Sequence, residues 1–102
     1  MFDLDHFKNI NGTYGHLVSD EVLKWVTKLA LTTKREEDIF FRYGGEEFMC
    51  ILFGVNQKDA FIIAERIRIM IMDSSIKNNE QDIKVTISIG LMTYPFDAVC
   101  IG

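Results

Sequence analysis

The chain has 102 residues, of which 48% are hydrophobic and 25% charged, a balance typical of one compact soluble domain. Its 11 basic and 15 acidic residues give a net charge of −4, so it lacks the basic field with which proteins hold nucleic-acid polymers. No apolar stretch reaches membrane-spanning length, so we expect a cytoplasmic domain that makes no membrane contact itself, although a parent protein could be membrane-anchored.

The first third of the chain predicts a short strand followed by helices. Residues 1–4 are apolar and strand-like, and residues 5–11 follow as about two helical turns before Gly12 and Gly15 break the pattern. From residue 19 to residue 33, apolar residues recur at three- and four-residue spacing. This spacing predicts an amphipathic helix with Ser19 as its N-cap.

The rest of the chain predicts a hairpin, a helix and a strand. Residues 39–43 and 47–53 are rich in aromatic and β-branched residues around Gly44-Gly45, which indicates a tight hairpin. A helix over 59–72 would turn one apolar stripe to the sheet, consisting of Ala60, Ile63, Ala64, Ile67 and Ile71. A polar connection over 73–82 leads to an alternating strand over 84–91. The order βαββαβ predicts an α/β (α+β) ferredoxin-like palm, in which helices pack against an antiparallel sheet.

Two carboxylates are candidates for a metal site. Asp3 ends the first strand and Glu46 lies at the hairpin turn, so their side chains would converge if those strands are neighbours. One or two carboxylates together with substrate phosphates form the usual protein site for Mg²⁺. The alternative is that Glu46 and Glu47 are ordinary solvated hairpin residues.

The helix that follows Asp3 is a candidate phosphate site. The backbone N–H groups of His6, Phe7 and Lys8 would lie unpaired at its N-terminus, a setting that attracts phosphate. An ordinary capped helix would give the same pattern, and Phe7 and Ile10 are most simply core residues.

Several blocks of the sequence together resemble the GGDEF family. They are DLDHFKNIN at 3–11, TYGH at 13–16, Asp20, RYGGEEF at 42–48 and SIG at 88–90, in the family's order and spacing. The similarity runs from residue 1 to about residue 91. We therefore expect residues 1–102 to be a single partial GGDEF domain, truncated at both ends, with 92–102 as an unassigned tail.

The resemblance implies a diguanylate cyclase, a nucleotidyltransferase that condenses two GTP into cyclic di-GMP by phosphoryl transfer dependent on Mg²⁺ or Mn²⁺. It implies that Asp3, Glu46 and the carbonyl of Leu4 bind the metal, with Glu46 and Glu47 as catalytic residues. Because the product is two-fold symmetric and each subunit would present one GTP, a homodimer is expected in the active state.

The resemblance also implies a set of GTP-binding residues: His6, Phe7, Lys8, Asn11, Asp20, Gly44 and Gly45. Asn11 and Asp20 would contact guanine. A carboxylate can accept hydrogen bonds from the N1–H and the exocyclic amine of guanine, and adenine supplies neither donor at those positions. Asp20 could equally be a helix N-terminal carboxylate favoured by the helix dipole. Gly44 and Gly45 lack Cβ atoms, which lets the turn backbone approach the nucleotide. Ser19, Leu17 and Gly12 depart from the family pattern and could loosen the guanine pocket.

A product-inhibition site for cyclic di-GMP is implied at Arg35 and Asp38, an RxxD motif, together with Arg66. The alternative is a solvated helix-to-strand connection.

Two other functions stay open at this point. One is a catalytically inactive GGDEF module that binds cyclic di-GMP or GTP as a signalling receptor, and the other is a related nucleotidyl cyclase or polymerase palm. Because residues 95–102 carry no lysine or arginine, we expect the 102-residue chain alone to make little cyclic di-GMP.

Overall fold

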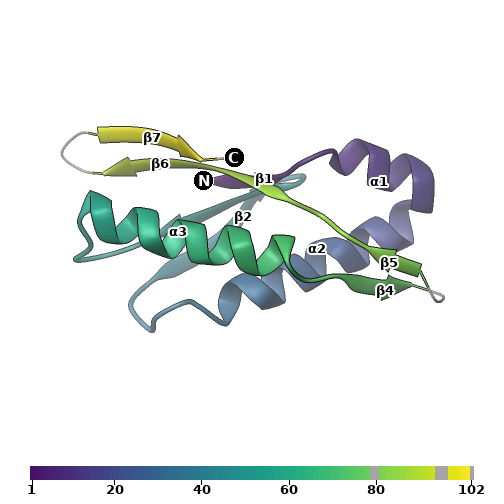
Figure 1. Cartoon of the computed structure of the whole chain (residues 1–102), viewed down its shortest axis with the longest axis horizontal. Helices are drawn as coiled ribbons and strands as arrows, with labels where there is room; N and C mark the ends of the chain where they lie inside the picture. The colour runs from purple at the N-terminus through teal and green to yellow at the C-terminus, as the bar shows by residue number, and fades with distance from the viewer. Residues whose placement is uncertain (79–80, 94–96, 102) are drawn as a thin grey trace.

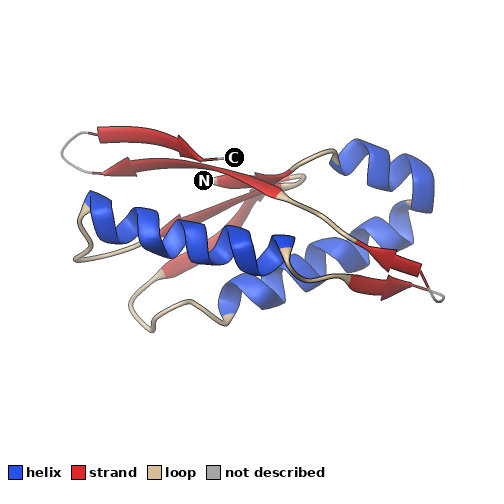
Figure 2. Cartoon of the chain, in the orientation of Figure 1, coloured by secondary structure: helices blue, strands red, loops and turns tan. Residues whose placement is uncertain are grey.

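The structure is a computed structural model that describes residues 1–78, 81–93 and 97–101. An antiparallel sheet of five strands has the order β2-β3-β1-β6-β7. Its strands are β1 (Phe2–Leu4), β2 (Ile39–Gly44), β3 (Glu47–Ile51), β6 (Ile87–Thr93) and β7 (Asp97–Ile101). The described helices are α1 (Phe7–Tyr14), α2 (His16–Leu31) and α3 (Gln57–Met72) (Figures 1 and 2). A separate two-stranded sheet joins β4 (Ile76–Asn78) to β5 (Gln81–Ile83).

The short strand β1 is at the centre of the fold. It pairs with β3 on one side and with β6 on the other, so Phe2 lies opposite both Phe48 and Ile89. Phe2 and Leu4 are buried, and the Phe2 ring stacks on that of Phe48 with centroids 5.2 Å apart. Because successive side chains of a strand point to opposite faces, Asp3 projects from the other face of the sheet.

The apolar stripes of α2 and α3 supply the rest of the core. Val22 and Val26 of α2 and Ile71 of α3 are fully buried, and Ile67 is 8% exposed. Figure 1 shows both helices along the same side of the sheet. The stripe predicted for residues 59–72 is confirmed at Ala60, Ala64, Ile67 and Ile71, and Ile63 is partly buried against the core. The prediction of a βαββαβ palm of the ferredoxin-like type is therefore confirmed.

The boundaries of the first two helices differ from the prediction. α1 begins at Phe7, because His6 adopts a left-handed conformation (φ 57°), and it continues through Gly12. Gly15, with φ of 88°, ends α1 and precedes α2 directly. Ser19 is therefore not an N-cap: it lies inside α2 and is 2% exposed. Because the residues around Ser19 are polar, the sequence did not indicate that the helix already begins at His16.

Further differences concern the second half of the chain. The polar connection expected over 73–82 contains β4 and β5, which pair Ile76 with Ile83, and Ile83 is buried. The strand expected over 84–91 begins later, at Ile87, and extends to Thr93. In the stretch left unassigned, β7 pairs with β6 along its whole length. Pro95 lies outside the described residues.

Candidate active site

The predicted metal residues lie where β1 meets the β2–β3 hairpin. Asp3 is directly opposite Glu47 on β3 and opposite Ser88 on β6, so all three belong to the sheet face away from the core. The backbone N–H of Leu4 donates to the carbonyl of Glu46 at 3.2 Å. The condition for their side chains to converge, that the first strand and the hairpin are neighbours, is therefore met.

The hairpin turn has open space beside it. It is formed by Gly45 and Glu46 rather than by Gly44-Gly45, because β2 continues through Gly44 with a register shift after Arg42. Gly45 has a positive φ of 29°, and its carbonyl accepts a 2.7 Å hydrogen bond from Nε of Arg42. A Cβ atom added to Gly44 would meet no protein atom within 4 Å. Packing within the described chain thus gives no reason for glycine at this position.

The turn between β1 and α1 consists of Asp5 and His6. The carbonyl of His6 accepts hydrogen bonds from the N–H groups of Asn9 and Ile10, at 3.0 and 3.2 Å. Among the residues that the structure describes, no side chain caps the N-terminus of α1. His6 and Lys8 are exposed, whereas Phe7 packs against the core. The first N–H groups of α1 therefore stand at the end of β1 that carries Asp3.

The carboxylates near this turn suit a hard divalent cation. Asp3, Glu46 and Glu47 are half-buried, so their oxygens are accessible from the open face of the sheet. The described residues contain no cluster of three or more His, Cys, Asp or Glu side chains able to enclose a metal ion. A smaller oxygen donor set of two carboxylates and a carbonyl fits Mg²⁺, which keeps waters and takes phosphate oxygens as its remaining ligands.

The two predicted guanine-reading residues flank the junction of α1 and α2. Ser19, buried beside this junction, donates from Oγ to Oδ1 of Asn11 at 3.2 Å and to the carbonyl of His16 at 3.0 Å. The serine that departs from the family pattern therefore holds Asn11 in place. Asp20 is exposed and lies a full turn inside α2, where the field of the helix N-terminus has weakened.

Asp20 also lines a surface groove of about 480 Å³, which is within the size range of small-molecule sites. The groove runs between α2 and the β2–β3 hairpin, and its other lining residues are Leu23, Lys24, Thr27, Lys28, Leu31, Arg42 and Phe48. Lys24 and Lys28 were not among the predicted site residues. Their four-residue spacing from Asp20 places them on the same helix face, which was the available signal.

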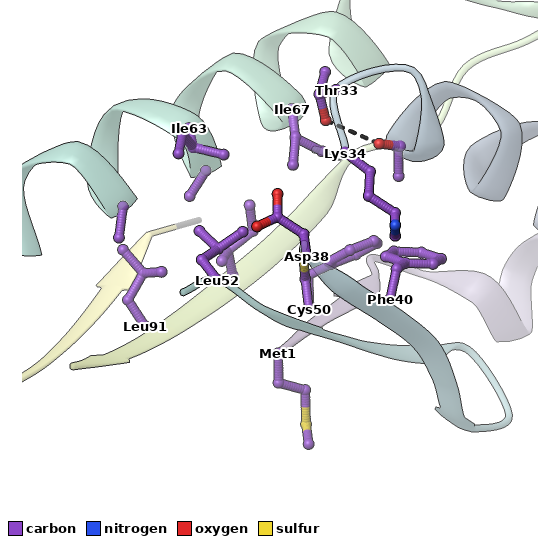
Figure 3. A pocket seen from close by; sticks show the side chains of 15 residues that line it. Met1, Thr33, Lys34, Asp38, Phe40, Cys50, Leu52, Ile63, Ile67 and Leu91 are labelled. Atoms are coloured by element: carbon purple, nitrogen blue, oxygen red, sulfur yellow. Dashed lines mark hydrogen bonds between the residues drawn. The ribbon is translucent and has the colours of Figure 1, made fainter. Parts of the chain in front are cut away.

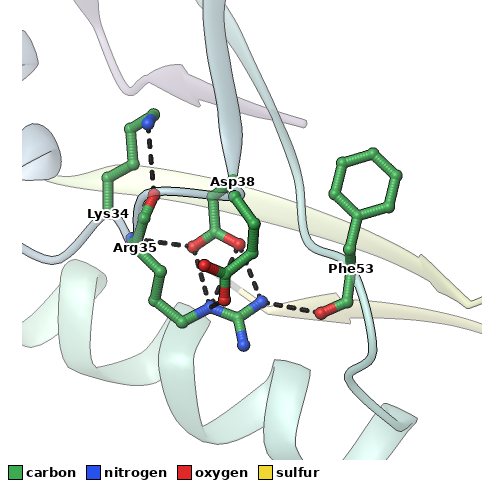
Figure 4. A network of polar contacts seen from close by, with 5 residues as sticks. Lys34, Arg35, Asp38 and Phe53 are labelled. Carbon is green, nitrogen blue, oxygen red and sulfur yellow. Dashed lines mark hydrogen bonds and ion pairs between the residues drawn. The ribbon is translucent and has the colours of Figure 1, made fainter.

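Arg35 and Asp38 are brought together and pair with each other (Figure 4). Nη2 of Arg35 donates to Asp38 Oδ1 at 2.7 Å and to the Phe53 carbonyl at 2.8 Å, and the Arg35 backbone N–H donates to Asp38 Oδ2 at 2.9 Å. The Asp38 side chain is only 2% exposed, against 39% for Arg35. Hydrogen bonding from Arg35 holds the pKa of Asp38 below its usual range. Arg66 is exposed on α3.

A second cavity lies inside the molecule, with Asp38 in its lining. It has a volume of about 50 Å³ and is mostly apolar, with Ile63, Leu52 and Leu91 in its wall beside Asp38 and Cys50 (Figure 3). Burial raises the pKa of the Cys50 thiol. The cavity contains neither Asp3 nor Glu46, so it is separate from the candidate metal site.

Fold and site together define a palm of the nucleotidyl cyclase type, in which an antiparallel sheet presents carboxylates on the face opposite its helices. No helix in the described part of the chain is both long and apolar enough to cross a membrane.

Comparisons with known proteins identify the family. Residues 1–99 match the model of "Diguanylate cyclase, GGDEF domain". The chain is 46% identical over 97 residues to diguanylate cyclase A of Treponema denticola, which covers 95% of this chain and 26% of that protein. The chain therefore belongs to the GGDEF family, and it spans about a quarter of this curated relative.

Solved structures agree with this assignment. The GGDEF domain of TpbB (YfiN) from Pseudomonas aeruginosa superimposes with a TM-score of 0.87 at 32% identity, covering 92% of this chain and 55% of that one. The GGDEF domain of DgcB from Caulobacter crescentus, in complex with c-di-GMP, gives a TM-score of 0.80 at 29% identity and covers 84% and 52%.

Proposed function

We propose that this chain is the catalytic palm of a diguanylate cyclase, which condenses two GTP into cyclic di-GMP and releases two pyrophosphates. The observation that carries the proposal is the register at the centre of the sheet, where Asp3 lies opposite Glu47 and Leu4 bonds to Glu46. This register joins the two sequence blocks that contain the predicted metal residues. Membership of the GGDEF family supports the same reaction.

Each residue of the site would have a separate role in the reaction. Asp3, Glu46 and the carbonyl of Leu4 would hold Mg²⁺ or Mn²⁺, with Glu47 beside them as a proton or secondary metal contact. When bound, the cation would neutralise phosphate charge and favour ionisation of the attacking 3′-hydroxyl. The N–H groups of His6, Phe7 and Lys8 would contact the triphosphate, because the start of α1 has no side-chain cap within the described chain.

Guanine selectivity is assigned to Asn11 and Asp20. The groove beside Asp20 is large enough for a base. The hydrogen bond from Ser19 fixes the orientation of the Asn11 side chain. Adenine would leave the Asp20 carboxylate without the donors that guanine supplies, which penalises ATP. The open space beside Gly44 and Gly45 leaves room for the nucleotide next to the turn. Two such palms in a homodimer would present two GTP to each other for the two successive attacks.

The test is synthesis of cyclic di-GMP from GTP and Mg²⁺, measured in a complete GGDEF domain that carries this sequence. Asp3→Asn and Glu46→Gln should each lower turnover by at least about 100-fold, because each removes a metal carboxylate without changing volume. Glu21→Gln is the matched control, because Glu21 is exposed on α2 and pairs only with Lys24 at 3.6 Å among described residues. Synthesis at the wild-type rate in either site variant would exclude the assignment.

We also propose that cyclic di-GMP binds at Arg35, Asp38 and Arg66 and inhibits the reaction. Arg35 is the accessible member of its pair, so it would contact the ligand directly, whereas the buried Asp38 would act by holding the guanidinium. Arg35→Ala should weaken binding of cyclic di-GMP by at least about 10-fold in calorimetry, because a charged donor is lost. Arg68→Ala is the control, since Arg68 pairs with Glu65 on α3. Equal affinities in all three proteins would leave the RxxD stretch as a structural connection.

A further inference from the structure

Asp5 has an unusual set of partners for a carboxylate beside a helix N-terminus. Its Oδ2 accepts a 2.7 Å hydrogen bond from Thr86 Oγ1, and its Oδ1 accepts a 2.7 Å bond from Ser88 Oγ. Its backbone N–H donates to the carbonyl of Thr86 at 2.9 Å. Three hydrogen bonds therefore join this single residue to the region where β6 begins, more than 80 residues later in the sequence.

This arrangement has a consequence for α1. An aspartate just before a helix commonly turns back and accepts hydrogen bonds from the first N–H groups of that helix. Asp5 instead turns to β6, and the start of α1 has no side-chain cap within the described chain. The first N–H groups of α1 are thus left for another acceptor, while the turn before them is held by the bonds of Asp5.

The same turn is held from its other side. One residue earlier, Leu4 donates to the Glu46 carbonyl of the hairpin turn. Asp3 precedes it and lies opposite Ser88, one of the two residues that hold Asp5. A loss of the Asp5 contacts would therefore loosen the Asp3 carboxylate, the Leu4 carbonyl and the first N–H groups of α1, which are the proposed phosphate and metal contacts. The groove beside Asp20 would be unaffected.

We infer that Asp5 is a positioning residue that fixes the β1–α1 turn against β6 in the geometry that receives the metal-bound triphosphate. Thr86 and Ser88 supply the two hydroxyl groups that orient it. The inference rests on the proposed function, because it assigns to Asp5 the geometry of the same phosphate site. It gives Asp5 no contact with the nucleotide, the metal or the reacting atoms.

The experiment compares two ligands by calorimetry on the complete GGDEF domain that carries this sequence: GTP with Mg²⁺, and guanosine, which has no phosphates. In the double variant Thr86→Val/Ser88→Ala, Asp5 loses both hydroxyl donors. Affinity for GTP with Mg²⁺ should fall about 10-fold or more, the usual effect of losing a group that orients a ligand-binding residue, while guanosine affinity stays within about two-fold. Thr86→Ser/Ser88→Thr keeps both hydroxyl groups and should bind both ligands as the wild type does.

Controls distinguish a selective loss of affinity for GTP with Mg²⁺ from a general loss of folded protein. Thr32→Val removes a hydroxyl bond to the Leu29 carbonyl at the far end of α2 and should change neither affinity. If the double variant does not fold, the single variant Ser88→Ala serves in its place, with a smaller loss confined to GTP. Unchanged binding of GTP with Mg²⁺, or an equal loss for guanosine, would overturn the positioning role. If the unmutated domain bound neither ligand, the proposed function itself would fail, a result distinct from both.

Discussion

At the scale of single residues, Asp5 and Asp38 show how the hydrogen-bond partners of an aspartate determine what it contributes to the protein. Asp38 is buried and ion-paired with Arg35, so its charge is compensated inside the protein. Asp5 is half-buried and receives hydrogen bonds from neutral hydroxyl groups. Asp5 is bonded directly to a distant segment, whereas Asp38 is linked to one only through Arg35, which also donates to the Phe53 carbonyl. The Asp38 pair therefore links stability to pH, whereas Asp5 links two segments near the candidate active site.

The stability of the chain should fall in acid through Asp38. Arg35 lowers the folded-state pKa of Asp38, so the pair stabilises the fold fully above the pKa of an unfolded aspartate. As the pH falls through the lowered folded-state pKa, the carboxylate is protonated and that contribution is lost. Denaturant unfolding between neutral pH and about pH 2 should show a steeper acid decline for the wild type than for Asp38→Asn.

Glu37→Gln is the matched control for this pH dependence. Glu37 also approaches Nε of Arg35, at 3.3 Å, but its side chain is 54% exposed. An exposed pair of this kind contributes little to stability, so its removal should leave the acid decline as it is in the wild type. An identical pH profile for Asp38→Asn and the wild type would contradict the role given to Asp38.

At the scale of elements, α3 carries more apolar residues than one face can bury. Ile71 is fully buried, whereas Ile62, Ile69 and Met72 are 46%, 43% and 38% exposed. The helix begins after Asn56, whose side chain accepts from the N–H of Asp59 at 2.8 Å. The stripe that faces the sheet, rather than total hydrophobicity, is what fixes the orientation of the helix.

Two truncations in α3 should therefore have unequal effects on stability. Ile71→Ala should lower the free energy of unfolding by about 2–5 kcal/mol, because it removes buried methyl groups and leaves a cavity. Ile69→Ala removes the same atoms from a residue that is 43% exposed and should cost less than about 1 kcal/mol. Urea unfolding of the two variants measures the difference, and equal losses would show that the orientation of α3 is wrong.

At the scale of the whole molecule, the proposed nucleotide site joins segments that are far apart in sequence. The β1–α1 turn, the start of α2 and the β2–β3 hairpin all contribute predicted ligand groups. A ligand that contacts all of them binds only the folded chain. The free energy of unfolding then rises by RT ln(1 + L/Kd), where L is the free ligand concentration.

GTP with Mg²⁺ should therefore raise the thermal stability of the chain. At a ligand concentration of 100 times Kd the gain is about 2.7 kcal/mol. ATP at the same concentration should give a smaller gain, because it cannot satisfy Asp20. Differential scanning fluorimetry with both nucleotides measures this preference, and Asp20→Ala should reduce the difference between them. An equal shift with GTP and ATP in the unmutated chain would contradict the guanine pocket.

The class of fold, the helix and strand periodicities and the family could all be predicted from the amino-acid sequence. Apolar spacing within α3 and alternation around Ile87 and Ile89 are local properties, so they can be read over a few residues. The order βαββαβ allowed the first strand and the hairpin to be neighbours, and the register shows that they are. The ligand roles of these residues stay predictions.

The distant partner of each local segment, in contrast, depends on how the whole chain packs. β7 and the β4–β5 pair were not predicted, because segments of three to five residues become strands only when a neighbouring strand supplies hydrogen bonds. Ser19 has the sequence of an N-cap but is buried beside Asn11, and Asp5 has the sequence of a helix-start carboxylate but bonds to Thr86 and Ser88. Short polar side chains can satisfy their hydrogen bonds with near or distant partners at similar free energy, so the packing of the whole chain makes the choice.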